Sequence, residues 1–478
     1  MEKERLRLLA ASDKPEFVAV YGRRRVGKTY LVREYFDDIF AFRVTGIEGA
    51  GLTTQLENFK TALDRHGLDN SVTIGNWFMA FERLRDLLEA DKRKSHNRRS
   101  RNSKPKQVVF IDEMPWLDTP RSGFLPALEH FWNSWASGQP QIMLIVCGSA
   151  TTWIKNKLLE NYGGLYNRIT AQFHLKPFTL AECEEYYRSM DMAINRMQVI
   201  QGYMVFGGIP HYMSLMNPTY SIDRNIDLLC FRDGAELGKE FNRVFASLFR
   251  DPDSRMHVVR ALGTLKRGMD RTEISKATAI GDGGDLTRIL DDLENSGFIR
   301  RYRAFGKKSK GSLYQLIDQF TLFSLQFMKE SAVKDERFWE SYINKGGYYA
   351  WRGYAFETVC LLHLEQIKAG LGIGGVATNY STWRSTEHDP GAQVDLVIDR
   401  SDGIIDLCEM KFTEAEYIIG KSEDLLLRNK KAAFEYEART RKLLRLIFVS
   451  PFGVKQNTYS GIVNAQITMD DLFMSKLP

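Results

Sequence analysis

A glycine-rich segment near the start of the chain most constrains how it can fold. Gly22-Arg23-Arg24-Arg25-Val26-Gly27-Lys28-Thr29 fits G-x-x-x-x-G-K-[ST], the pattern of phosphate-binding loops. Residues 17–21 before it predict a buried strand, and residues 30–36 after it predict a helix. The glycines let backbone N–H groups face phosphate oxygens, and the helix N-terminus adds a favourable dipole. The alternative, a turn that binds nothing, is disfavoured because strand and helix are both in place.

The chemistry of such a loop assigns a task to its polar residues. The Lys28 ammonium is expected to reach the β- and γ-phosphates, and the Thr29 hydroxyl to ligate Mg²⁺. The residues predicted to bind the nucleotide here are Gly22, Arg25, Val26, Gly27, Lys28, Thr29 and Tyr30.

A second motif follows downstream, where residues 107–113 form an apolar run ending in two acids. This is the Walker B pattern, in which a buried strand delivers Asp112 beside the Mg²⁺ and Glu113 polarises the attacking water. A strand end followed by an acidic helix cap is the alternative. Downstream of a phosphate-binding loop, we favour the Walker B interpretation.

Three further segments are candidates for sensing the nucleotide. Ser149 follows a third apolar strand, residues 142–147, as a γ-phosphate sensor or as a helix N-cap. Arg168 is a candidate arginine finger or sensor, and a plain surface arginine is equally compatible. Gly207-Gly208-Ile209-Pro210 could close over the nucleotide through its fixed backbone, or simply make a turn.

Length and composition set outer limits on the protein. A chain of 478 residues predicts two to four domains. Its apolar runs fall short of the roughly 20 residues that span a bilayer, so no membrane association is expected. Without an N-terminal charged-then-apolar signal, a cytoplasmic location is predicted. Five scattered cysteines without a C-x-x-C pair predict buried apolar residues in a reducing compartment.

The positive charge of the chain is concentrated in one segment. Residues 92–106 hold eight Lys/Arg and no acid, and leaving them out changes the formal net charge from +6 to −2. Without apolar periodicity, the segment is predicted to be a mobile loop. It could bind nucleic acid by neutralising phosphates, or be a solvated charged insertion.

The middle of the chain changes pattern. Up to about residue 215, apolar strands alternate with amphipathic helices, which predicts a parallel sheet covered on both faces. Thr179 with Glu182 predicts a capping box. From about 250 to 320, three helices and a hairpin (298–305 and 312–317) are typical of a winged helix. Because its third helix is acidic, we favour a regulatory or spacer role over DNA reading.

The last block carries separate chemistry. The strands 394–398 and 404–411 each embed acids, and Glu357 lies on a helix upstream. Glu357, Asp395 and Glu409 could hold Mg²⁺, with Lys411 orienting a water or stabilising the pentacovalent charge. Alternation puts Glu409 and Lys411 on one face of their strand. A salt-bridge cluster is the alternative to this metal site.

Together these motifs resemble a known family. GRRRVGKT, VVFIDEMPWL, LIVCGSA, GGLYNR and GGIP stand in the order of the archaeal-type P-loop ATPases of the STAND branch, close to AAA+ proteins. The resemblance implies ATP binding and slow hydrolysis used as a conformational switch. It assigns Asp112 and Glu113 to Walker B, Ser149 to a sensor, and Gly208 and Pro210 to the nucleotide-sensing turn. The tail resembles the PD-(D/E)XK nuclease domain often fused to these ATPases.

The resemblance completes the expected architecture and function. The predicted α/β architecture is a P-loop NTPase parallel-sheet core over 1–175, a helical lid over 176–250, a winged helix over 251–334 and a PD-(D/E)XK-like α/β domain over 335–478. The first hypothesis is an ATP- and Mg-dependent switch with a nuclease-like effector acting on nucleic acid, and a homo-oligomer is a further expectation. The alternatives are an ATP-dependent regulatory or DNA-binding protein whose tail is an inactive docking domain, and a scaffold with a purely structural nucleotide.

Overall fold

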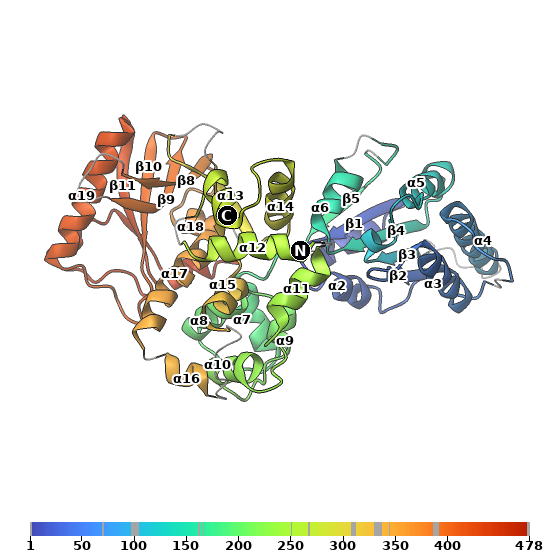
Figure 1. Ribbon diagram of the computed structural model, residues 1–478, viewed down its shortest axis with the longest axis horizontal. Coiled ribbons are helices and arrows are strands. Elements are labelled where there is room, and N and C mark those ends of the chain that lie inside the picture. Colours follow the sequence, from blue (N-terminus) through green and yellow to red (C-terminus); the bar gives the residue numbers. More distant parts are fainter. Residues whose placement is uncertain are drawn as a thin grey trace. The chain divides into compact units, whose positions relative to one another are not determined.

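The computed structural model describes residues 2–68, 71–96, 105–160, 163–165, 167–249, 251–265, 268–306, 312–328, 337–343, 345–385 and 392–475, with backbone alone for 91–96 (Figure 1). The protein is mixed α/β and divides into two compact units, residues 1–176 and 177–478.

The first unit is built on a five-stranded parallel sheet in the order β2-β3-β4-β1-β5. This confirms the parallel sheet predicted from the alternation of strands and helices. The strands are β1 Glu16–Tyr21, β2 Phe42–Thr45, β3 Gln107–Asp112, β4 Ile142–Gly148 and β5 Ala171–His174.

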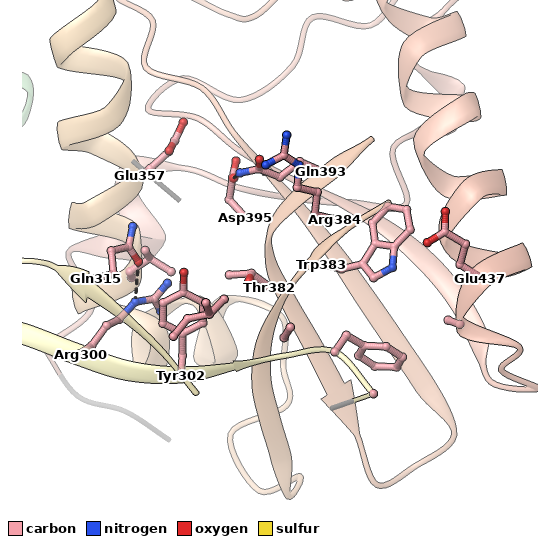
Figure 2. A pocket seen from close by; sticks show the side chains of 16 residues that line it. Arg300, Tyr302, Gln315, Glu357, Thr382, Trp383, Arg384, Gln393, Asp395 and Glu437 are labelled. Atoms are coloured by element: carbon pink, nitrogen blue, oxygen red, sulfur yellow. Dashed lines mark hydrogen bonds between the residues drawn. The ribbon is translucent and has the colours of Figure 1, made fainter. Parts of the chain in front are cut away.

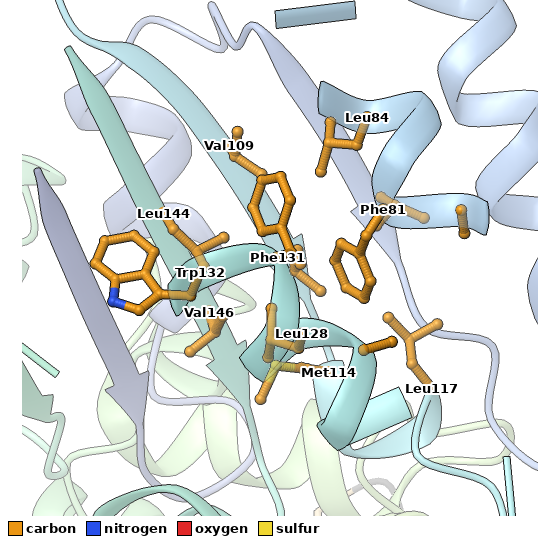
Figure 3. Close-up of a cluster of buried hydrophobic side chains, with 14 of the residues drawn as sticks. Phe81, Leu84, Val109, Met114, Leu117, Leu128, Phe131, Trp132, Leu144 and Val146 are labelled. Carbon is orange, nitrogen blue, oxygen red and sulfur yellow. The ribbon is translucent and has the colours of Figure 1, made fainter. Parts of the chain in front are cut away.

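Both faces of this sheet are covered, which explains why its central strands are continuous apolar runs. In β4, Leu144 and Val146 face one hydrophobic cluster, and the alternate residues Ile145 and Cys147 face another. Figure 3 shows the first cluster, where side chains such as Phe131 of α5 pack against β3 and β4. The helices of the unit are α1 Glu2–Ala10, α2 Lys28–Tyr35, α3 Leu52–Arg65, α4 Trp77–His96, α5 Phe124–Ser134 and the short α6 Thr151–Ile154.

The basic segment of residues 92–106 begins inside a helix. Because α4 continues to His96, the loop predicted from residue 92 onward is wrong for its first five residues. Residues 97–104 lie outside the described chain. At the far end of the segment, the Lys106 ammonium donates to the Pro140 carbonyl at 2.7 Å, just before β3 begins.

The second unit contains a seven-stranded sheet in the order β12-β11-β10-β9-β8-β6-β7. The hairpin β6–β7 and the run β8–β9–β10 are antiparallel, whereas β10–β11–β12 and β6–β8 are parallel. The strands are β6 Ile299–Ala304, β7 Ser312–Leu316, β8 Thr378–Arg384, β9 Gln393–Arg400, β10 Ile404–Met410, β11 Leu443–Val449 and β12 Ala465–Ile467.

The predicted wing hairpin is therefore part of the C-terminal sheet. Its strand β6 pairs with β8, placing Arg303 opposite Ser381 and Ala304 opposite Thr382. The Phe305 amide extends this pairing by donating to the Thr382 carbonyl at 2.8 Å. The sheet thus joins residues on the two sides of the predicted boundary at 334/335.

Helices surround this sheet, and several match their sequence signals. Thr179 forms the predicted capping box with Glu182 at the start of α7. The buried face of α14 consists of Leu286, Ile289, Leu290 and Leu293, which have the i, i+3, i+4, i+7 spacing of an amphipathic helix. Glu357 lies on a helix, as predicted, and this helix runs from Gly346 to Leu362. The helices are α7 Leu180–Ser189, α8 Arg196–Phe206, α9 Pro210–Ser214, α10 Ile222–Ile226, α11 Glu240–Leu248, α12 Pro252–Gly263, α13 Arg271–Thr278, α14 Gly284–Asn295, α15 Gln319–Phe327, α16 Phe338–Tyr342, α17 Gly346–Leu362, α18 Leu364–Gly370, α19 Lys421–Ala438 and α20 Met469–Leu472.

Two whole-chain expectations bear on function. All five cysteines are free and buried, as their scattered spacing predicted. Within the described part of the chain, each helix is too short or too polar to cross a membrane.

Candidate functional site

The candidate site lies at the carboxyl edge of the first sheet. In the parallel register, Tyr21 of β1 is level with Gly148 of β4, and Ile111 of β3 is level with Val146. The loop after β1, the acid that ends β3 and the serine after β4 therefore emerge at one edge. This is where ligands bind in open parallel sheets.

The backbone of the loop requires its two motif glycines. Gly22 has a φ of +144°, and a Cβ there would lie 2.1 Å from the Leu175 carbonyl oxygen. Gly27 has a φ of +88° and directly precedes α2. Arg25 also has a positive φ, of 75°. A left-handed backbone favours glycine, so the spacing of the motif follows from the path of the loop.

The Lys28 side chain lies beneath the loop. Only 5% of its surface is exposed, and its ammonium donates to the Arg23 carbonyl and to the Ser149 hydroxyl, both at 2.9 Å. The loop thus curls around the cation that begins α2. Both of these partners are neutral oxygens, so neither is a counter-charge that would compete with a phosphate for Lys28.

Ser149 connects this cation to Glu113. The Ser149 hydroxyl donates to one Glu113 carboxylate oxygen at 2.8 Å, and its amide donates to the other at 3.2 Å. Glu113 itself has a φ of +45°, a left-handed conformation that is uncommon for a glutamate. Gly46 makes room for it, because a Cβ there would lie 2.5 Å from the Glu113 carbonyl oxygen.

Thr29 and Asp112 form the other half of the site. The Thr29 hydroxyl lies 3.0 and 3.2 Å from the two Asp112 carboxylate oxygens. Burial raises the pKa of Asp112, the charge of Glu113 raises it further, and the bond from Thr29 opposes both. This carboxylate is therefore an anion whose charge is poorly compensated by its protein surroundings.

These oxygen donors fit Mg²⁺, which prefers hard ligands and retains waters and substrate phosphates. Among the described residues, no group of three or more His, Cys, Asp or Glu is placed to hold a metal. A cation between Thr29 and Asp112 would therefore complete its coordination with phosphate and water oxygens. That is the usual arrangement for Mg²⁺ bound together with a nucleotide.

The other residues predicted to act on the nucleotide differ in placement. Val26 is buried, whereas Tyr30 is 69% exposed on the first turn of α2. Arg168 is exposed on the segment before β5, and its amide donates to the Leu165 carbonyl at 3.0 Å. Its role as a finger stays a prediction.

Gly208 and Pro210 belong to the second unit. Gly208 has a φ of +66°, and a Cβ there would lie 2.2 Å from the Phe178 carbonyl oxygen. The Phe178 amide donates to the Gly208 carbonyl at 2.8 Å, and Pro210 opens α9. The backbone turn between α8 and α9 accounts for Gly208 and Pro210 without a ligand. Their contact with a nucleotide remains a prediction.

Two contributors were missed from the sequence. The Arg23 carbonyl anchors Lys28, and Gly46 accommodates the backbone of Glu113. A backbone carbonyl leaves no residue-type signal. Gly46 follows directly after β2, and a glycine at a strand's carboxyl end was a signal that could have been used.

In the second unit, Glu409 and Lys411 form an ion pair of 2.9 Å at the end of β10. Lys430 of α19 binds the other Glu409 carboxylate oxygen. Burial of Glu409 acts to raise its pKa, but the charges of Lys430 and Lys411 outweigh this and the pKa is lowered. The Lys411 pKa is raised, because the Glu409 charge and hydrogen bond outweigh its burial.

Glu357 and Asp395 instead line a cavity of about 570 Å³ (Figure 2). The Asp395 carboxylate accepts a hydrogen bond of 2.7 Å from the side-chain amide of Gln393. Neither Glu409 nor Lys411 is among the described residues that line this cavity. The predicted set is thus divided between a cavity wall and an ion pair in which Glu409 is buried and Lys411 is partly exposed, and its metal role stays a prediction.

Comparisons with known proteins find distant likeness. No family model matches. An uncharacterized protein of Methanocaldococcus jannaschii is 23% identical over 354 residues, covering 73% of this chain and 72% of that protein.

Among solved structures, a Walker-type ATPase of Pyrococcus abyssi matches with a TM-score of 0.44 and 16% identity, over 68% of this chain and 95% of its own. The ORC2 protein of Aeropyrum pernix matches with a TM-score of 0.40 and 15% identity, over 68% and 91%. Cdc6p from Pyrobaculum aerophilum follows with a TM-score of 0.30 and 12% identity, over 68% and 91%. The function of this chain is therefore inferred from its own residues.

Proposed function

We propose that the unit of residues 1–176 binds a nucleoside triphosphate with Mg²⁺ and hydrolyses its terminal phosphate. One observation carries the proposal: hydrogen bonds connect Lys28, Ser149, Glu113, Asp112 and Thr29 into one cluster at the loop, with the Glu113 amide donating to Asp112 at 3.0 Å. A structural turn would have no need for a buried ammonium, two acids and two hydroxyls at one sheet edge. The family resemblance of the motifs makes ATP the expected nucleotide.

Each residue of the cluster has a task in this proposal. The loop amides and Lys28 bind the phosphates, and Lys28 neutralises charge on the β- and γ-oxygens. Thr29 and Asp112 hold Mg²⁺, which when bound neutralises phosphate charge. Glu113 orients and polarises the attacking water. Ser149 hydrogen-bonds both Lys28 and Glu113, so binding of the γ-phosphate would change the hydrogen bonds of Glu113 through Ser149.

Nucleotide binding by matched variants tests the proposal. Lys28→Ala should weaken MgATP binding and abolish turnover, because it removes the buried cation of the loop. Lys14→Ala, which changes an exposed lysine of the same unit, is the control. Isothermal titration with MgATP, together with phosphate release, measures both effects. Wild-type affinity in Lys28→Ala would refute the assignment.

For the C-terminal unit, metal-dependent cleavage of nucleic acid is a second proposal. One observation favours it: the ion pair of 2.9 Å between Glu409 and Lys411 keeps a predicted metal ligand beside the predicted catalytic lysine. Purified protein incubated with plasmid, linear and single-stranded substrates and Mg²⁺ or Mn²⁺ should show cleavage. Asp395→Ala and Lys411→Ala should abolish it and spare ATP hydrolysis. Absence of cleavage in the wild type would leave a binding or docking role for this unit.

A further inference from the structure

The lining of the cavity in the second unit carries charged side chains of both signs. One wall comes from the hairpin β6–β7 and carries Arg300 and Tyr302, and the other carries Glu357 of α17 and Asp395 of β9. Figure 2 shows Glu357 and Asp395 across the cavity from Arg300 and Tyr302, with Arg384 and Glu437 also in the lining. At about 570 Å³, the volume is in the range of small-molecule sites.

Arg300 is held rigidly but not neutralised by its described neighbours. Its Nε donates to the Gln315 side-chain oxygen at 2.8 Å, and its guanidinium carbon lies 4.4 Å from the Tyr302 ring centroid. Gln315 is itself fixed, because its amide nitrogen donates to the Tyr354 hydroxyl at 3.4 Å. Burial lowers the pKa of Arg300, and Asp395 acts on it only through its charge, without an ion pair in the described chain.

A half-buried guanidinium in this setting favours an anion. The bond to Gln315 uses Nε, so the two terminal nitrogens retain the planar fork that matches two oxygens of a phosphate. A desolvated cation gains most from such a partner, because its charge is weakly screened there. The opposite wall supplies carboxylate oxygens, which accept hydrogen bonds from N–H or O–H groups.

We propose that this cavity binds a small organic phosphate, with the phosphate on Arg300 and hydrogen-bond donors of the ligand on Glu357 and Asp395. A nucleoside monophosphate has both features and a suitable size. The site is separate from the loop at Gly22–Thr29 and depends on residues of the wing hairpin, a segment outside the predicted nuclease set. It is therefore independent of ATP hydrolysis. It shares Glu357 and Asp395 with the proposed metal site for nucleic-acid cleavage, and Arg300, which lies outside that set, distinguishes the two proposals.

Isothermal titration of the full chain tests the proposal with three probes: inorganic phosphate, a nucleoside monophosphate and the matching unphosphorylated nucleoside. The monophosphate should bind most tightly and the nucleoside most weakly. Arg300→Gln should weaken monophosphate binding at least about tenfold, the size expected for one charge-assisted contact. Arg300→Lys should fall between, because it keeps the charge and loses the fork. Arg303→Gln, on an exposed position of the same strand, is the matched control.

Two further arms separate this site from others. Lys28→Ala should leave the Arg300-dependent binding intact, which distinguishes the cavity from the nucleotide loop. Glu357→Gln should reduce the preference for the monophosphate over inorganic phosphate. Far-UV circular dichroism and thermal unfolding establish that each variant is folded. Equal binding by folded Arg300→Gln and wild type, or tighter binding of a 5′-phosphorylated oligonucleotide than of the monophosphate, would overturn the assignment to a small ligand.

Discussion

The hydroxyl of Ser149 donates a 2.8 Å hydrogen bond to the carboxylate of Glu113. The two residues follow different strands, β4 and β3, so the bond spans the carboxyl edge of the sheet. With Lys28 donating to the same hydroxyl, a phosphate that engages Lys28 or Ser149 would alter the partners of Glu113. Under the proposed function, this bond would connect Glu113 to the nucleotide through Ser149.

Replacing this serine should affect hydrolysis more than binding. Ser149→Ala removes a hydrogen bond to a charged acid, worth roughly 1.5–3 kcal/mol. The turnover number should fall by about ten- to a hundredfold, while the MgATP dissociation constant changes little. Steady-state phosphate release and titration calorimetry measure the two quantities. Ser137→Ala, at a partly exposed position after α5, is the control. A larger loss of affinity than of turnover would assign Ser149 to binding.

Glu113 should be required for turnover and dispensable for affinity. Glu113→Gln keeps the size of the side chain and removes the charge that polarises the attacking water. Asp112 and Thr29 remain to hold Mg²⁺. We expect wild-type MgATP binding with turnover reduced to background, measured by single-turnover hydrolysis. Unchanged hydrolysis would place the water-activating group elsewhere.

Replacing Arg168 tests whether a second copy of the chain completes the nucleotide site. If it acts as a finger in a second copy of the chain, Arg168→Ala should lower turnover by up to roughly 10³–10⁵-fold. The specific activity of the wild type should then rise with protein concentration. Arg65→Ala, an exposed arginine at the end of α3, should behave as the wild type. A rate independent of concentration would indicate a monomeric enzyme or a finger supplied in cis.

A buried histidine should make stability fall in mild acid. His363 is 1% exposed, its Nε2 accepts a 3.0 Å bond from the Leu180 amide, and its Nδ1 lies 2.8 Å from the Val359 carbonyl. Burial lowers its pKa from 6.5 to about 4, although the Val359 carbonyl acts in the opposite direction. Between these two pH values the unfolded chain binds the extra proton and the folded chain does not. The free energy of unfolding should therefore decrease as the pH falls through this window, by roughly 3 kcal/mol at most.

Chemical denaturation of wild type and His363→Gln across pH 4 to 7 measures this effect. The variant should be less stable at neutral pH, because Leu180 loses its acceptor, and its stability should depend less on pH. His257→Gln, at an exposed position of α12, should retain the wild-type dependence. Parallel pH curves for wild type and His363→Gln would contradict the prediction.

The sequence predicted the strands and helices that bear the first site because local patterns determine them. Strands buried on both faces are continuous apolar runs, so β1, β3 and β4 could be recognised nearly to the residue. The positions of Lys28, Thr29 and Asp112 followed from the ends of those elements. The bond from Lys28 to Ser149 could not be derived, because it depends on side-chain geometry between segments 121 residues apart.

The tail shows where local patterns reach their limit. Alternation placed Glu409 and Lys411 on one face, and the two form an ion pair although Lys411 directly follows the last residue of β10. The second partner of Glu409, Lys430, lies on α19, and no local sequence pattern predicts this contact. Near Asp395, the β8–β9 register shifts between Ser381 and Trp383, so simple alternation no longer decides which side chains meet Asp395.

The pairing of β6 with β8 limits where this chain can be cut into fragments that fold. A fragment that starts after the wing would expose the backbone edge of β8, and such open edges invite intermolecular strand addition and aggregation. It would also lack Arg300 and half of the cavity wall. Recombinant pieces, and exchange of modules during evolution, should therefore keep residues 299–475 together. The sequence predicts the wing as part of a separate winged-helix domain, but its hairpin forms one edge of the C-terminal sheet.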